Sequence, residues 1–117
     1  MWSDAARKGN VIAVSGTVAT DADHRGLFPG DLVGQTRHIY RSVEKLLGRM
    51  GATFADVIKT TDFIVPGAVA EYPKTAAVRR EFFQGAYPAA TGVVVHSLLS
   101  PDWLIEIEFL AVVDAEG

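Results

Sequence analysis

The sequence predicts an α+β fold in which two helices cover one face of a sheet of four or five strands. Two segments have the hydrophobic spacing of amphipathic helices, and four others are rich in β-branched and apolar residues. The length of 117 residues, with 49% hydrophobic and 21% charged residues, is typical of one globular domain. We therefore expect residues 1–117 to form a single domain.

The first helix is predicted over residues 32–50, because apolar residues recur there at spacings of three, four and seven. These residues are Leu32, Ile39, Val43, Leu46, Leu47 and Met50. Asp31 is suited to cap the helix, and Gly51 is suited to end it. A second helix is predicted from about Val69 to Phe83. One stripe along it is formed by Tyr72, Ala76, Arg79 and Phe83.

Four strands are predicted before, between and after these helices. They are Val11 to Ser15, ended by Gly16; Val57 to Val65, ended by Pro66 and Gly67; Thr91 to His96; and Trp103 to Val113. Residues 21–30, rich in Asp, Gly and Pro, are predicted to form a loop. Thr53 to Asp56 has the spacing of a short capping box.

The last two strands are apolar at nearly every position, which is typical of strands covered on both faces. Two helices cover only one face, and the sequence offers no further element for the other. A second copy of the same sheet would cover it, and a closed symmetric ring leaves no open edge. We therefore expect a homo-oligomer; the alternative is a sheet face that is partly exposed to water.

Charge and composition argue against several classes of partner. The chain has 11 Lys and Arg against 14 Asp and Glu, a net charge of −3, so nucleic acid and anionic membranes are not expected partners. With no Cys, disulfides, thiol nucleophiles and zinc–thiolate sites are excluded. The chain start lacks the pattern of a secretory signal and no apolar run approaches a membrane span, which predicts a cytoplasmic protein.

Eight short segments carry a family resemblance through their order and spacing. They are Asn10 to Gly16, Asp21, Gly34 to Arg37, Met50 to Ala52, Asp56 to Thr61, Glu81 to Phe83, Tyr87 to Ala89 and Ile105 to Glu108. Together they resemble the Rid (reactive intermediate deaminase, YjgF) family from Trp2 to Val113. The resemblance implies a chorismate-mutase-like mixed sheet and a homotrimer with clefts between subunits. It also implies hydrolysis of reactive imines and enamines, released by pyridoxal-phosphate enzymes, to keto acids and ammonia.

The resemblance also assigns roles to individual residues. Glu106 matches the glutamate that positions or activates the attacking water. Ser15 and Gly16 match the strand end that lines the cleft, and Trp2 stands where the family usually has a tyrosine. Glu106 is therefore the predicted catalytic residue.

Three positions depart from the family pattern. Ala90 replaces the arginine that grips the substrate carboxylate, Gly92 replaces a frequent cysteine, and Ala76 replaces an asparagine that often faces the cleft. The segment from Ala90 through Thr91 to Gly92 is still predicted to line the binding site, with a roomier and less polar mouth. The usual hydrolysis of 2-imino acids is the activity that these replacements put in question.

Physical arguments bear on Glu106 and also point to further candidate side chains. Strand alternation places Glu106 and Glu108 on one face, where apolar surroundings would raise a carboxyl pKa toward neutrality; Glu108 is predicted to be structural. His96 shares a strand face with Ala90 and is either an acid–base group or a structural histidine. Arg79 is the first candidate to replace the missing arginine, or else it pairs with an acid. Arg37 and Arg41 are the other candidates.

Other site motifs are incomplete. The segment from Asp21 resembles a calcium loop, but Arg25 and Leu32 stand at ligand positions, and the three histidines lack metal-ligand spacing. No metal or cofactor is therefore predicted. The sequence favours a hydrolase or deaminase acting on a small imine or enamine metabolite. The alternatives are a non-catalytic metabolite-binding module and, disfavoured by the net charge, a ribonuclease.

Overall fold

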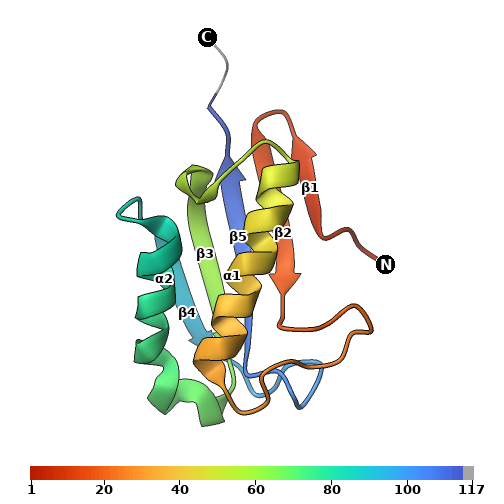
Figure 1. Ribbon diagram of the computed structural model, residues 1–117, viewed down its shortest axis with the longest axis vertical. Coiled ribbons are helices and arrows are strands. Elements are labelled where there is room, and N and C mark those ends of the chain that lie inside the picture. Colours follow the sequence, from red (N-terminus) through yellow and green to blue (C-terminus); the bar gives the residue numbers. More distant parts are fainter. Residues whose placement is uncertain (115–117) are drawn as a thin grey trace.

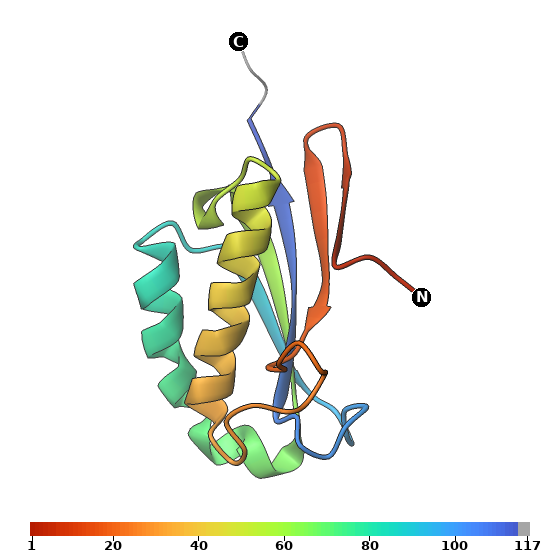
Figure 2. The same cartoon turned by 45° about the vertical axis from the view of Figure 1, so that its right-hand side comes forward.

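The structure is a computed structural model that describes residues 1–114, and it contains one five-stranded mixed sheet (Figure 1). The strands are β1 (Ala5–Lys8), β2 (Val11–Thr17), β3 (Val57–Ile64), β4 (Ala89–Val94) and β5 (Ile105–Val112). Their order is β1-β2-β5-β3-β4; β3 and β4 are parallel, and the other neighbours are antiparallel. Helices α1 (Leu32–Arg49) and α2 (Ala76–Phe83) lie on the same face (Figure 2). The predicted fold class is confirmed.

Helix α1 begins and ends where the sequence predicts. The Asp31 side chain accepts a hydrogen bond from the Gly34 amide at 2.9 Å, and Gly51 has a φ of +77°, which favours glycine. Tyr40, fully buried at the centre of the helix, lies 5.4 Å from the rings of Phe54 and Phe109, measured between centroids. This aromatic contact fixes α1 against the sheet.

The second predicted helix is wrong over its first half. Residues Pro66–Thr75 form a 3-10 helix (η2), and α-helical geometry starts only at Ala76. Pro73 explains the difference, because it has no backbone N–H and disfavours the α conformation of the preceding residue. The predicted inward stripe is confirmed at Phe83, which is buried, and at Arg79, which is partly buried.

Strand boundaries differ from the prediction in several places. Strand β1 was not predicted, because four residues ending in Arg7 and Lys8 have no hydrophobic alternation; pairing with β2 forms it. Strand β2 runs past Gly16 instead of ending there. Strand β4 starts and ends two residues early, so His96 follows it, and β5 starts at Ile105. The capping box from Thr53 is confirmed at a short 3-10 helix (η1, Phe54–Asp56).

The two faces of the sheet differ sharply. The face under the helices carries buried side chains, which include Ile12, Ile107 and Phe109. No helix covers the opposite face within residues 1–114 (Figure 2), and Val11 and Val93 on it are exposed. Strand β4 is exposed along its whole length. The chain therefore leaves one sheet face without its own cover.

None of the helices in residues 1–114 is both long enough and apolar enough to cross a membrane.

Candidate functional site

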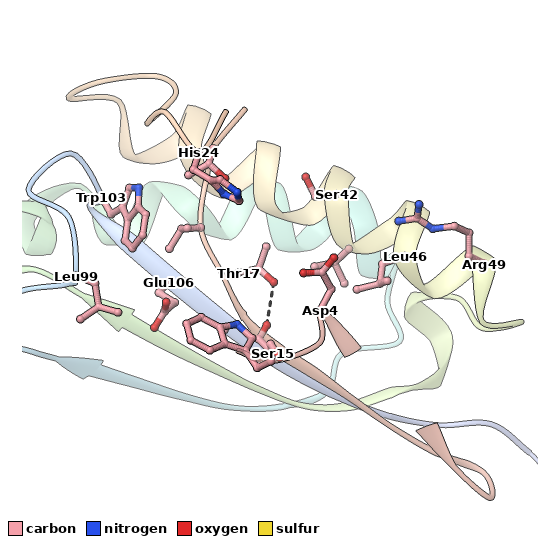
Figure 3. A pocket seen from close by; sticks show the side chains of 15 residues that line it. Asp4, Ser15, Thr17, His24, Ser42, Leu46, Arg49, Leu99, Trp103 and Glu106 are labelled. Atoms are coloured by element: carbon pink, nitrogen blue, oxygen red, sulfur yellow. Dashed lines mark hydrogen bonds between the residues drawn. The ribbon is translucent and has the colours of Figure 1, made fainter. Parts of the chain in front are cut away.

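A cavity of about 520 Å³ lies where β2 departs from regular pairing with β5 (Figure 3). The register shifts between Val14 and Thr17, so the residues between them are free of the regular ladder. The cavity is lined by residues from the N-terminal segment, β2, two loops, α1 and the start of β5. These are Trp2, Asp4, Ser15, Gly16, Thr17, Val18, Thr20, His24, Ser42, Val43, Leu46, Arg49, Leu99, Trp103 and Glu106.

Glu106 is one of the two acids that line this cavity, and Asp4 is the other. A Cβ atom at position 16 would lie 2.9 Å from Cδ of Glu106, so Gly16 leaves the room that the carboxyl occupies. Burial, and secondly the charge of Glu108, raise the pKa of Glu106. Within residues 1–114, its carboxyl has no hydrogen bond and no ion pair. The acid is therefore available to a molecule in the cavity.

The N-terminal segment is held against β2 by hydrogen bonds to Ser15. The Ser15 amide donates to the Asp4 carbonyl at 2.9 Å, and its hydroxyl donates to the Ser3 carbonyl at 2.6 Å. These bonds bring Trp2 and Asp4 to the cavity, although Trp2 is 79% exposed. The indole therefore forms an outer wall that remains open to solvent.

Gln35 ties together the two loops at the other end of the cavity. Its buried side chain donates to the carbonyls of Phe28 at 3.2 Å and Asp102 at 3.0 Å, and accepts from the Leu104 amide at 2.9 Å. One of these loops carries His24, and the other carries Leu99 and Trp103, which all line the cavity. A single amide side chain thus sets the relative position of both loops.

The predicted site residues fall into two separate groups in one chain. Trp2, Ser15, Gly16 and Glu106 line the cavity together. The segment from Ala90 to Gly92 lies on β4, at the sheet edge beyond β3, and His96 follows that strand. Thr91 accepts a hydrogen bond from Lys59 there. None of the β4 group lines the cavity.

Arg79 belongs to a buried polar cluster on the helix-covered side. Its Nη1 lies 3.6 Å from Oδ2 of Asp62 and donates to Oγ1 of Thr75 at 2.8 Å. The Tyr72 hydroxyl donates to the same Asp62 oxygen at 2.5 Å. Burial raises the pKa of Asp62, while the Tyr72 hydrogen bond and the Arg79 charge oppose that rise. Arg79 pairs with an acid and does not line the cavity.

The other two candidate arginines also lie outside the cavity. Arg37 forms an ion pair with Glu81 at 3.0 Å, and Arg41 is exposed on α1. The arginine that lines the cavity is Arg49, in the last turn of α1. Sequence reasoning missed Arg49, His24 and Trp103 as site residues. Their only shared signal is proximity in space, which requires the position of the β1–β2 hairpin and both loops.

The segment that resembles a calcium loop forms a turn. The Asp21 carboxylate accepts hydrogen bonds from the amides of Asp23 at 2.8 Å and Arg25 at 2.9 Å. In the part of the chain that the structure describes, no group of three or more His, Cys, Asp or Glu is placed to hold a metal ion.

Comparison with known proteins identifies the family. The family model described as Endoribonuclease L-PSP matches residues 1–113. A RutC family protein from Pyrococcus abyssi is 32% identical over 110 residues, which cover 94% of this chain and 84% of the relative. The chain belongs to the Rid/YjgF family. The resemblance predicted from short segments is confirmed.

Solved structures of Rid/YjgF proteins share the fold. A member of the YjgF/YER057c/UK114 family from Mycobacterium tuberculosis superposes with a TM-score of 0.82 at 31% identity, covering 96% of this chain and 86% of that one. The Rid family protein YyfA from Yersinia pestis superposes with a TM-score of 0.85 at 27% identity, covering 96% and 87%. The mixed sheet with two helices is thus the Rid/YjgF fold.

Proposed function

We propose that this protein hydrolyses a small reactive imine or enamine metabolite to a carbonyl compound and ammonia. In the imine form, water adds through its oxygen to the C=N carbon, the C–N bond then breaks, and the nitrogen leaves as ammonia. Glu106 accepts a proton from the water as the C–O bond forms and passes it to the imine nitrogen, which gives a carbinolamine. It then takes the hydroxyl proton as the C=O bond forms and gives it to the amino nitrogen as the C–N bond breaks. The net reaction consumes one water and needs no oxidant or reductant.

The observation that carries this proposal is the state of Glu106. Its carboxyl faces a cavity of about 520 Å³, has no partner within residues 1–114, and has a pKa raised chiefly by burial. A carboxyl whose pKa is raised by burial holds a proton more readily than an exposed one, which suits it both to accept a proton and to return it. Gly16 supports the assignment, because a larger residue would push this carboxyl away from its place.

We further propose a homotrimer in which the second group of site residues comes from a neighbouring copy. The uncovered sheet face and the exposed strand β4 support this assembly, because both offer apolar surface that a second copy would cover. In this arrangement Ala90, Thr91, Gly92 and His96 of one copy would approach the Glu106 cavity of another. The expected location is the cytoplasm.

A second candidate function is metabolite binding without turnover. The specific observation in its favour is that β4 contributes only Thr91 as a polar side chain between Ala90 and Gly92. A site to which β4 adds no charged group could bind a metabolite without converting it. Binding by calorimetry with no ammonia release would favour this candidate.

The test is ammonia release from freshly generated imines and from enamines of the aminomuconate type. Glu106→Gln should slow release by roughly 10²- to 10⁴-fold, because the amide cannot accept the proton. The matched control is Glu108→Gln, a glutamate two residues along the same strand face that does not line the cavity. This control should remain active, with its acidic pH limb moved to lower pH, because the charge of Glu108 raises the Glu106 pKa.

Two outcomes would contradict the proposal. One is the absence of turnover with every substrate in the series. The other is turnover that Glu106→Gln leaves unchanged. Light scattering tests the assembly separately: a monomer at micromolar concentration would exclude the trimer.

A further inference from the structure

The walls of the cavity favour a flat apolar ligand body. The chain contains two tryptophans, Trp2 and Trp103, and both line the cavity. Leu99, which is 88% exposed, and Leu46 add aliphatic surface. Indole rings are large, rigid contact surfaces that gain from packing against planar unsaturated groups. The cavity is therefore built for more than a two- or three-carbon molecule.

One strong cation lines this cavity without a partner in the part of the chain that is described. The Arg49 side chain makes no hydrogen bond, and no carboxylate of residues 1–114 lies within 4.0 Å of its guanidinium nitrogens. Asp4 also lines the cavity but is outside that distance. A guanidinium with five free donors is a suitable receptor for a carboxylate, which it binds through two parallel hydrogen bonds.

Arg49 and Glu106 lie at different ends of the cavity. In Figure 3 the Arg49 side chain bends back along α1 toward Leu46 and Ser42, while Glu106 lies beyond Thr17 and Ser15, near Leu99. In this view Thr17, Ser15 and Asp4 lie between the two charged groups, so a ligand that contacts both must be elongated.

We propose that the cavity binds an elongated, unsaturated organic acid. Its carboxylate pairs with Arg49, its flat chain lies against Trp2 and Trp103, and its other end reaches Glu106. This inference rests on the proposed function, because it names the substrate class of the same site. Arg49, the proposed receptor for the carboxylate, lies on α1 of the same chain as Glu106, far along the sequence from Ala90.

The two tryptophans make binding directly measurable, because every indole in the chain lines the cavity. The probe is hexa-2,4-dienoate, a flat six-carbon acid, compared with its neutral amide by quenching of tryptophan fluorescence. In the wild type, the acid should bind about 10-fold more tightly than the amide. Arg49→Gln should bring the ratio of the acid affinity to the amide affinity close to one. Arg49→Lys should keep part of the preference for the acid.

The matched control is Arg41→Gln, which removes an exposed arginine from the same helix outside the cavity. It should leave the acid-to-amide ratio at the wild-type value. Circular dichroism confirms that each variant is folded. The inference is overturned if Arg49→Gln leaves the ratio unchanged, if Arg41→Gln lowers it equally, or if the wild type binds neither probe at 10 mM.

Failure of this inference is distinguishable from failure of the proposed function. Ammonia release with a KM that Arg49→Gln leaves unchanged would overturn the role of Arg49 and keep the hydrolase. Arg49-dependent binding of the acid, without turnover of any substrate, would remove the hydrolase and keep the acid-binding cavity. Glu106→Gln should retain acid binding in either case, because the amide leaves the Arg49 end untouched.

Discussion

Glu106 and Asp62 are carboxyls whose pKa burial raises, yet their surroundings differ. The Asp62 carboxyl is almost fully buried, accepts a hydrogen bond from Tyr72 and lies 3.6 Å from Arg79. The Glu106 carboxyl faces a cavity and has no partner in residues 1–114. A raised pKa alone therefore does not mark a reactive group. The presence or absence of partners separates an acid that holds structure from one that is free to react.

The largest effect is expected from replacing each of the two acids, Glu106 and Asp62, by its amide. Glu106→Gln should lower kcat by roughly 10² to 10⁴-fold, because proton transfer is lost, and should leave stability within about 0.5 kcal/mol. Asp62→Asn should leave kcat per folded molecule near the wild-type value. Ammonia release and urea unfolding of both variants measure the contrast. A similar loss of kcat in both variants would contradict the distinction between a reactive Glu106 and a structural Asp62.

The next effect concerns stability alone. Asp62→Ala should lower the free energy of unfolding by about 2–3 kcal/mol, because the Tyr72 hydroxyl then loses its acceptor and Arg79 loses its ion-pair partner. Glu106→Ala is the control and should cost less than about 1 kcal/mol, because no side chain loses a partner. Chemical denaturation measures both. Equal losses would mean that Glu106 has a structural partner after all.

Gly16→Ala tests whether the position of Glu106 matters. The added methyl would lie 2.9 Å from the Glu106 Cδ, so the flexible carboxyl must move. We expect a roughly 10-fold lower kcat, with a stability change below about 1 kcal/mol. The control is Gly48→Ala on α1, where an added methyl meets nothing within 4 Å. That variant should keep full activity and gain about 0.5–1 kcal/mol of stability.

The smallest effect is a pH dependence of stability. The folded-state pKa of Asp62 is raised above its ordinary value of 3.8, so the folded state holds this proton more tightly than the unfolded state. The contribution of Asp62 is therefore fully present below pH 3.8 and is lost as pH rises through the raised pKa. The free energy of unfolding, measured with urea across this pH window, should fall less steeply for Asp62→Asn than for the wild type. Parallel wild-type and variant curves would refute this assignment.

The sequence predicted the elements whose signals are local. Helix α1 has an apolar stripe, an Asp31 cap and a Gly51 end, and each acts through neighbouring residues. Strand β1 was missed because its four residues gain their structure from pairing with β2. The second helix was overextended because its apolar stripe continues through Pro73, whose missing N–H changes the helix type.

The candidate site was predictable in part for the same reason. Family resemblance pointed to Glu106, on a strand that the sequence also predicted, and to Gly16, where β2 continues past the predicted strand end. Arg49, His24 and Trp103 come from three segments that meet only when the hairpin and the loops take their places. The role of Arg79 depended on Asp62, a partner that no periodicity relates to it. Contacts between distant segments set the rest of the site.

Gln35 has a consequence for how this site can change during evolution. Its one amide group holds the loop with His24 and the loop that ends at Trp103, through bonds to backbone atoms only. The loop tips can therefore change their side chains freely, and so alter ligand preference, while both backbones stay anchored. Insertions near Phe28 or Asp102 would instead shift both loops at once. Side-chain changes that alter ligand preference are thus expected at the loop tips, whereas the chain length around Phe28 and Asp102 is expected to stay constant.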